Sequence, residues 1–219
     1  MEEKIRITTR AAVRGALAGK TIGRTIFNEF VRVRCTSLSG RVLDLGGGKN
    51  PSYLPLLPRG ISLTRSDRES SEGVARVDFN EELPFSNAEF DSVLIFNALY
   101  IAEDSESLLR EIYRVLKRDG TLFLASPFIA NEMPEPHDYL RFTAEGLTHV
   151  LKRAGFSDIA VERMGERASA TVQIRHPFYV SNFVRAFVYP FAILVDRLIP
   201  ASARFAHPMP IGYFVRAKK

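Results

Sequence analysis

Short apolar runs alternate along this chain with longer amphipathic stretches. Residues 41–45, Arg-Val-Leu-Asp-Leu, form an apolar run that stops at three glycines, which is typical of a buried strand. Comparable runs occur further along the chain, and we predict additional strands at residues 61–64, 74–77, 91–96, 121–125, 159–162 and 211–215.

Three stretches place apolar residues at helical spacing. Between residues 11 and 34 they recur mostly every three to five positions, which predicts one amphipathic helix with arginines and lysine on its surface. Residues 105–117 carry a similar apolar face. A third helix at about residues 143–154 begins with Thr143 as N-cap and is closed by Gly155. Strands alternating with helices predict an α/β fold, a mostly parallel sheet with helices on both faces.

Length and composition indicate one globular core. The chain has 219 residues, of which 46% are hydrophobic and 25% charged. Cys35 is the single cysteine, so we expect no intrachain disulfide or cysteine-rich zinc site, and a buried thiol. The charged first residues lack the apolar segment of a secretory signal, which favours a cytoplasmic protein. The apolar run at 186–195 contains Pro190 and is shorter than the roughly 20 residues that span a bilayer.

Charge is distributed unevenly along the chain. Residues 1–41 hold nine Lys and Arg against three acids, residues 42–151 hold ten against eighteen, and residues 152–219 hold eleven against four. The basic ends suggest an anionic partner such as a membrane surface or a phosphorylated carrier, although solvated basic faces without a partner explain the pattern as well. A nucleic-acid partner is disfavoured, because the sequence outside the insertion described below contains no motif of aromatic and basic residues suited to stacking on bases.

Gly46, Gly47 and Gly48 directly follow the first predicted strand. Ligands of such sheets bind outside the carboxyl ends of the strands, and glycines allow a tight turn that a ligand can approach. The dinucleotide-binding fingerprint would need a further glycine at position 51, which is Pro51 and has no N–H. Asp44, inside the buried strand, should accept hydrogen bonds from the turn or help hold a cationic ligand group.

Two more acids follow the second and third predicted strands. Asp67 is suited to paired ribose hydroxyls, since one carboxylate accepts from both. Asp78 could accept an adenine amino hydrogen while the neighbouring Phe79 ring supplies apolar contact. Turn or N-cap roles are the alternative for either acid.

Together these motifs resemble those of small class I S-adenosylmethionine-dependent methyltransferases. The matching segments lie within about residues 40–160: residues 42–48, Asp67, and residues 78–80, 83–85, 90–93 and 110–120. The resemblance implies a seven-stranded Rossmann-like sheet and S-adenosylmethionine as cofactor, and Asn97 completes the cofactor-binding candidates. Asn50 and Tyr100 depart from the family pattern, and they leave the methyl acceptor open. Residues 1–39 would be an N-terminal helical extension, and residues 40–219 the methyltransferase domain.

A polar segment after the fifth predicted strand contains His137, Asp138, Tyr139 and Arg141. It resembles a His-Asp-Tyr-x-Arg-Phe-Thr segment of methyltransferase-like proteins associated with bacterial polysaccharide and sugar modification. A general base helps methyl transfer when the nucleophile is a hydroxyl. We assign His137 as this base, oriented by Asp138 or another acid, with Tyr139 and Arg141 as further catalytic candidates. The alternative is a packing network in which Arg141 pairs with Asp138 and Tyr139 lies on the core.

An insertion at about residues 169–209 separates the last two predicted strands. It is rich in aromatic residues and arginines, which suits a substrate lid or an interfacial helix on lipid headgroups. A helical hairpin packed on the core or on a second subunit is the alternative, which leaves a homodimer open. We expect O-methylation of a small or carrier-linked acceptor, with a saccharide hydroxyl ahead of a lipid-like or quinone acceptor. C- or N-methylation, and a binding protein without catalysis, are the competing functions.

Overall fold

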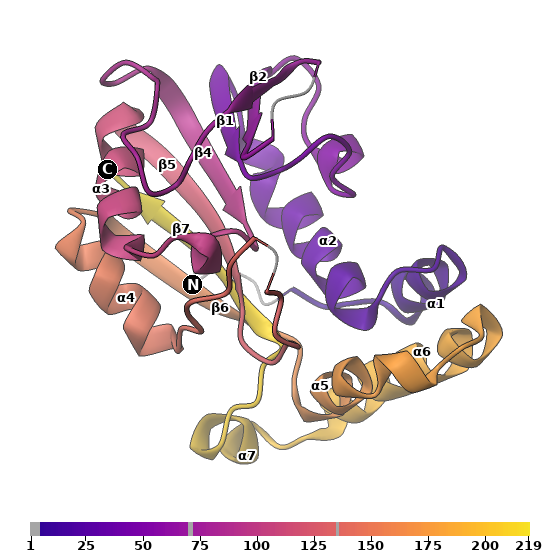
Figure 1. Cartoon of the computed structure of the whole chain (residues 1–219). Helices are drawn as coiled ribbons and strands as arrows, with labels where there is room; N and C mark the ends of the chain where they lie inside the picture. Colours follow the sequence, from indigo (N-terminus) through magenta and orange to yellow (C-terminus); the bar gives the residue numbers. More distant parts are fainter. Residues whose placement is uncertain (1–4, 70–71, 135) are drawn as a thin grey trace.

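Seven strands form one sheet at the centre of the molecule in the computed structural model, which describes residues 5–69, 72–134 and 136–219 (Figure 1). Their order across the sheet is β3-β2-β1-β4-β5-β7-β6, and only β7 is antiparallel to its neighbours. The strands are β1 Arg41–Leu45, β2 Ser62–Asp67, β3 Val74–Arg76, β4 Phe90–Phe96, β5 Leu116–Pro127, β6 Ser157–Met164 and β7 Gly212–Lys218. The predicted Rossmann-like fold class is confirmed.

Helices cover both faces of this sheet because successive residues of each strand point to opposite sides. On β4, Val93 and Ile95 pack with α3 (Ser105–Val115) and α4 (Ala144–Arg153), whereas Leu94 and Phe96 belong to the core beneath α2 (Ile22–Arg34). The central strands are therefore buried on both faces, which explains their almost unbroken apolar runs. Among the described residues, four short 3-10 helices complete the connections: η1 Cys35–Ser37, η2 Leu54–Leu56, η3 Leu99–Ile101 and η4 His176–Phe178.

The N-terminal segment forms two helices, so the prediction of one helix over residues 11–34 is wrong. Helix α1 (Thr9–Leu17) ends before Gly19, whose φ of +70° stops a right-handed helix, and the Thr21 side chain caps α2 by accepting from the Arg24 N–H at 3.0 Å. A Cβ on Gly15 would collide with the Thr25 side chain, so a glycine allows α1 to fold closely onto α2. The apolar residues keep their helical spacing from α1 into α2, so the sequence pattern did not indicate the break between the two helices.

Two local predictions are confirmed. Thr143 caps α4 by accepting from the Gly146 N–H at 3.1 Å, and Gly155 follows the helix with a φ of +103°. Cys35 is buried, and this burial raises the pKa of its thiol to about 12.

The predicted helical insertion lies between β6 and β7 and consists of α5 (Arg167–Ile174), η4, α6 (Asn182–Leu198) and α7 (Ala201–Ala206). Since β6 runs in the same direction as β5, the insertion leaves the sheet at the edge formed by the carboxyl ends of the parallel strands and returns there, where Gly212 pairs with Pro127. Helix α6 packs along α1 and α5 (Figure 1). Within the described residues, no helix has both the length and the apolar character needed to cross a membrane.

Candidate functional site

The glycine turn after β1 is held by hydrogen bonds to β2. The Gly46 N–H donates to the Ser66 carbonyl at 2.9 Å, and an Arg65 guanidinium N–H donates to the Lys49 carbonyl at 2.7 Å. Gly46 and Gly48 have φ values of +74° and +67°, which side chains rarely allow. The turn is therefore fixed against β2 in a shape that requires glycine.

Asp44 is fully buried under this turn and accepts from the Tyr53 hydroxyl at 2.8 and 2.9 Å through its two carboxylate oxygens. We expected its donors to be N–H groups of the turn, but the hydrogen bonds recorded for this carboxylate come from Tyr53. Burial raises the Asp44 pKa to about 6, although the Tyr53 bond and the Arg65 charge act in the opposite direction. A carboxylate with a raised pKa near the carboxyl end of β1 is what a ligand-binding group would show.

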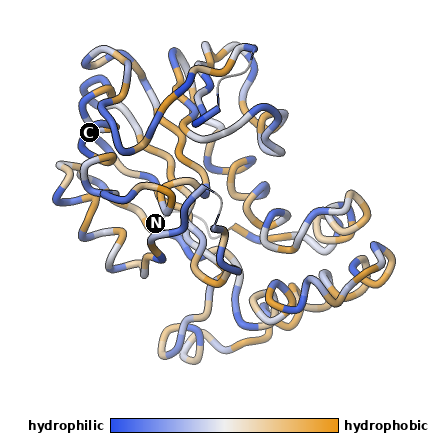
Figure 2. The backbone as a smooth tube through the Cα atoms, viewed as in Figure 1, coloured by the Kyte–Doolittle hydropathy of each residue, from blue (hydrophilic) through white to orange (hydrophobic). Residues whose placement is uncertain are grey.

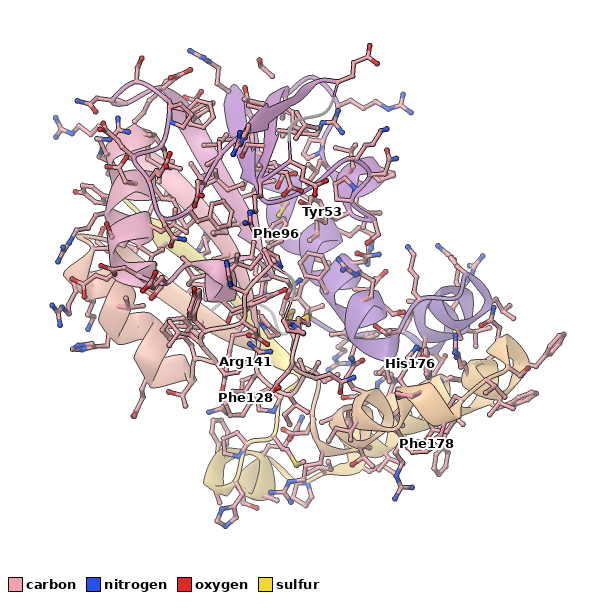
Figure 3. All side chains as sticks on the ribbon, in the orientation of Figure 1. Tyr53, Phe96, Phe128, Arg141, His176 and Phe178 are labelled. Atoms are coloured by element: carbon pink, nitrogen blue, oxygen red, sulfur yellow. The ribbon has the colours of Figure 1, made fainter. Side chains whose placement is uncertain are left out.

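Tyr53 is itself positioned by aromatic packing. Its ring meets Phe96 edge-on with centroids 5.0 Å apart and Phe27 of α2 at 5.8 Å, and Figure 3 shows Tyr53 beside Phe96. A Cβ on Gly47 would collide with the Asp44 carboxylate and lie 2.6 Å from the Tyr53 hydroxyl. The middle glycine thus makes room for this buried pair.

Asp67 and Phe79 converge on the same turn from β2 and from the loop after β3. One Asp67 carboxylate oxygen lies 3.0 Å from where a Gly48 Cβ would be, and the other accepts from the Arg68 N–H. The Phe79 ring lies 3.1 Å from the corresponding position at Gly46. A carboxylate and an aromatic ring therefore flank a turn that has no side chains. A Cβ added to Gly46 or Gly48 would come into close contact with one of these two groups.

Asp78 and Asn97 have different surroundings. Asp78 is exposed and accepts from the Asn80 N–H at 3.0 Å, which is a turn role. Asn97 directly follows β4 with a φ of +52°, and its N–H donates to the Ala125 carbonyl of β5 at 2.8 Å. Asparagine tolerates this left-handed backbone better than most residues. Asn97 thus lies at the carboxyl edge of the sheet, one residue before Ala98, which borders Gly46.

The polar segment at residues 137–141 lies along η3. The Tyr139 N–H donates to the Tyr100 carbonyl at 2.9 Å, and the Arg141 guanidinium pairs with Asp138 and lies over the Tyr100 ring, 5.2 Å from its centroid. The hydrogen bond from the Arg141 guanidinium lowers the Asp138 pKa. Asp138 also accepts from the Met133 N–H at 2.8 Å. Arg141 and Asp138 therefore hold the loop together.

His137 and Tyr139 remain on the surface of that loop. Their rings lie 5.4 Å apart at 31°, and Tyr139 is 46% exposed rather than packed on the core. The recorded partners of Asp138 are Arg141 and Met133, so this carboxylate is not the acid that orients His137.

Tyr53 and Ser126 were not predicted from the sequence. Tyr53 lies nine residues beyond Asp44 beside a proline-containing 3-10 turn, and no pattern marks it as the partner of Asp44. Ser126, at the carboxyl end of β5, is 1% exposed, and its hydroxyl has no hydrogen-bond partner among the described residues. Its sequence signal was a serine ending an otherwise apolar strand.

The segment that contains this turn is similar to known proteins. Residues 43–124 match the methyltransferase domain family. The chain is 25% identical over 154 residues to 2-methyl-6-phytyl-1,4-hydroquinone methyltransferase 2 of Oryza sativa subsp. japonica, covering 58% of this chain and 42% of that protein. It is 28% identical over 127 residues to the O-methyltransferase rstn1 of Aspergillus nomiae, covering 50% and 56%. The chain thus spans about half the length of these relatives.

The fold is shared over almost the whole chain. A SAM-dependent methyltransferase from Archaeoglobus fulgidus superposes with a TM-score of 0.59 at 20% identity, covering 90% of this chain and 94% of that one. Because this superposition covers 90% of the chain, the shared fold extends well beyond residues 43–124.

Proposed function

We propose that this chain, which carries a methyltransferase domain at residues 43–124, transfers a methyl group from S-adenosylmethionine to a hydroxyl of a small or carrier-linked acceptor. The observation that supports this most strongly is the convergence of Asp44, Asp67 and Phe79 on a turn where Gly46 and Gly48 need positive φ. S-Adenosylmethionine is the cofactor, and when bound it supplies an electrophilic methyl group on a sulfonium.

Each residue around the turn binds a different part of the cofactor. Asp67 accepts hydrogen bonds from paired ribose hydroxyls, and the Phe79 ring packs against the adenine. Asp44, kept in place by Tyr53, provides negative charge beneath the turn for the cationic part of the cofactor. Asn97, at the end of β4, completes the set together with Asp78, whose second carboxylate oxygen, the one that does not accept from Asn80, accepts from the adenine amino group.

His137 accepts the proton of the acceptor hydroxyl in this proposal. It is exposed, so a substrate can reach its ring, and histidine is the side chain most often used as a general base. Tyr139 lies against it and shapes the entrance. Arg141, which pairs with Asp138, positions the loop. A saccharide hydroxyl is the acceptor we favour, because the segment at residues 137–143 resembles that of sugar-modifying proteins.

A lipid-like or quinone acceptor is the second candidate. The rice relative is named for a hydroquinone substrate, and the insertion beside the carboxyl edge of the sheet exposes aromatic side chains. C-methylation of such a ring would need no base at His137, so the two candidates differ in their dependence on this residue.

Titration calorimetry with S-adenosylmethionine and its demethylated product tests the cofactor assignment. We expect both to bind the wild-type protein with dissociation constants of about micromolar strength, worth about 8 kcal/mol. If neither binds, both the methyltransferase proposal and the role of the turn are wrong.

Replacing His137 by alanine should lower turnover about a hundredfold at neutral pH, because a positioned general base contributes at least that much. Cofactor affinity, measured by the same calorimetry, should stay nearly unchanged. His149→Ala, which removes another exposed histidine on α4, is the matched control. Equal turnover by the His137 and His149 variants would eliminate His137 as the base and favour C-methylation.

A further inference from the structure

The insertion carries an exposed apolar surface that the site does not use. Along α6, Phe183 and Phe187 are 75% and 76% exposed, and the stripe continues toward the end of the helix. Its other members on the insertion are Phe178, Val180, Val184, Phe191, Leu194, Leu198 and Phe205. Figure 2 shows apolar residues recurring along the whole of α6, and Figure 3 shows Phe178 near the outer border of the molecule. Apolar patches of this kind mark interaction surfaces in proteins.

The charges exposed on the insertion are all positive. Its two acids, Glu166 and Asp196, are buried and accept from backbone N–H groups at the start of α5 and at Met209. The arginines remain at or near the surface: Arg167, Arg175, Arg185, Arg197 and Arg204. Helix α1, which packs along α6, adds Arg10 and Arg14 and contains no acid. An occupant of this surface must therefore combine apolar groups with negative charge.

From these observations we infer that α6, with η4 and α7, docks on the surface of an anionic lipid bilayer. Phenylalanines would enter the boundary between headgroups and acyl chains, and the arginines would meet lipid phosphates, which is how amphipathic helices bind membranes in the interfacial plane. A second copy of the chain fits less well, because two identical cationic faces would repel each other.

The position of this surface determines which side of the molecule would face the bilayer. The insertion leaves and rejoins the sheet at the carboxyl edge, where the glycine turn and Asn97 also lie. A bilayer bound through α6 is therefore on the side of the molecule from which ligands reach the sheet. The docking itself does not depend on methyl transfer.

Vesicle cosedimentation tests the inference with the full-length protein. We expect binding to vesicles of equal parts phosphatidylcholine and phosphatidylglycerol, and much weaker binding to phosphatidylcholine alone. The double variant Phe183→Ser/Phe187→Ser should bind the anionic vesicles at least about tenfold more weakly, because two large apolar side chains no longer enter the lipid. Both residues are mostly exposed, so the thermal unfolding temperature should change little.

Charge is tested separately with Arg175→Gln/Arg204→Gln, which should weaken binding about tenfold or more, since each basic residue near an anionic surface contributes roughly a factor of five. Its matched control is Arg118→Gln/Lys152→Gln, which removes two exposed cations from β5 and α4. Failure of the wild type to bind anionic vesicles, or equal binding by the serine variant, would overturn the inference. A dimer that the serine substitutions dissociate, without vesicle binding, would identify the surface as a subunit interface instead.

Fluorescence gives a second readout, because the chain contains no tryptophan. In the variant Phe187→Trp the introduced indole should shift its emission to shorter wavelength when anionic vesicles are added. An unchanged emission maximum would contradict insertion of this face into lipid.

Discussion

Substituting arginine for Gly46 is expected to abolish S-adenosylmethionine binding, with a loss of affinity of at least about a hundredfold. The residue has a φ of +74°, and a Cβ there would lie 2.8 Å from the Ala98 Cβ and 3.1 Å from the Phe79 ring. Beyond this contact, a long side chain would displace the Phe79 ring and extend across the face of the turn that we assign to the cofactor. Calorimetry on the purified variant measures the loss.

Gly60→Arg is the matched control for that experiment. Gly60 has a φ of +90°, so arginine is strained there too, at a cost of about 1 to 3 kcal/mol, but no atom lies within 4 Å of its added Cβ. Both variants should therefore lose stability, and only Gly46→Arg should lose cofactor binding. Retention of wild-type affinity by Gly46→Arg would remove the glycine turn from the cofactor site even if the wild-type protein binds S-adenosylmethionine.

As pH rises, Asp44→Asn should become more stable relative to the wild type, whereas its affinity for S-adenosylmethionine should become weaker relative to the wild type. Burial raises the Asp44 pKa to about 6 in the folded chain, above its usual value of 3.8. The folded state therefore retains this proton more strongly than the unfolded state. The stabilisation from this group is fully present below the unfolded-state pKa of 3.8 and is lost as pH rises through the folded-state pKa of about 6. The free energy of unfolding should therefore fall by about 2 to 3 kcal/mol between about pH 4 and pH 7. The asparagine variant should lack this loss.

Denaturant unfolding of the cofactor-free proteins at several pH values measures that difference. Asp158→Asn, the same change at an exposed carboxylate at the start of β6, should follow the wild-type pH dependence. Parallel curves for wild type and Asp44→Asn would show that Asp44 does not titrate in this range.

Affinity for S-adenosylmethionine should fall about ten- to a hundredfold in Asp44→Asn near pH 8, because the carboxylate charge that attracts the cationic cofactor is gone. In the wild type, affinity should fall below about pH 6, where Asp44 becomes protonated. The variant should lack this dependence. An affinity that is unchanged by the substitution would assign the cationic group of the cofactor to another acid.

The candidate site was predictable to the extent that it depends on backbone shape and strand ends. Three consecutive glycines after an apolar strand, followed by acids after the next two strands, placed Gly46, Asp67 and Phe79 correctly around one turn. The partner of Asp44 was not predictable in this way, because Tyr53 reaches the carboxylate from beside a 3-10 turn and is held by Phe96 and Phe27, which come from β4 and α2. Likewise, a helical apolar pattern could not reveal that Gly19 and Thr21 divide α1 from α2.

By itself, the sequence determined the order of the strands and of α3 and α4, the sheet's burial on both faces and the location of the glycine turn, since hydrophobic period, glycine and capping residues act locally. Tertiary structure alone decided that Asp44 is buried against Tyr53, that Asp138 binds Arg141 rather than His137, and that the aromatic face of α6 is exposed. These features depend on how distant elements pack, and packing sets both the solvation of a charge and the neighbours of a side chain.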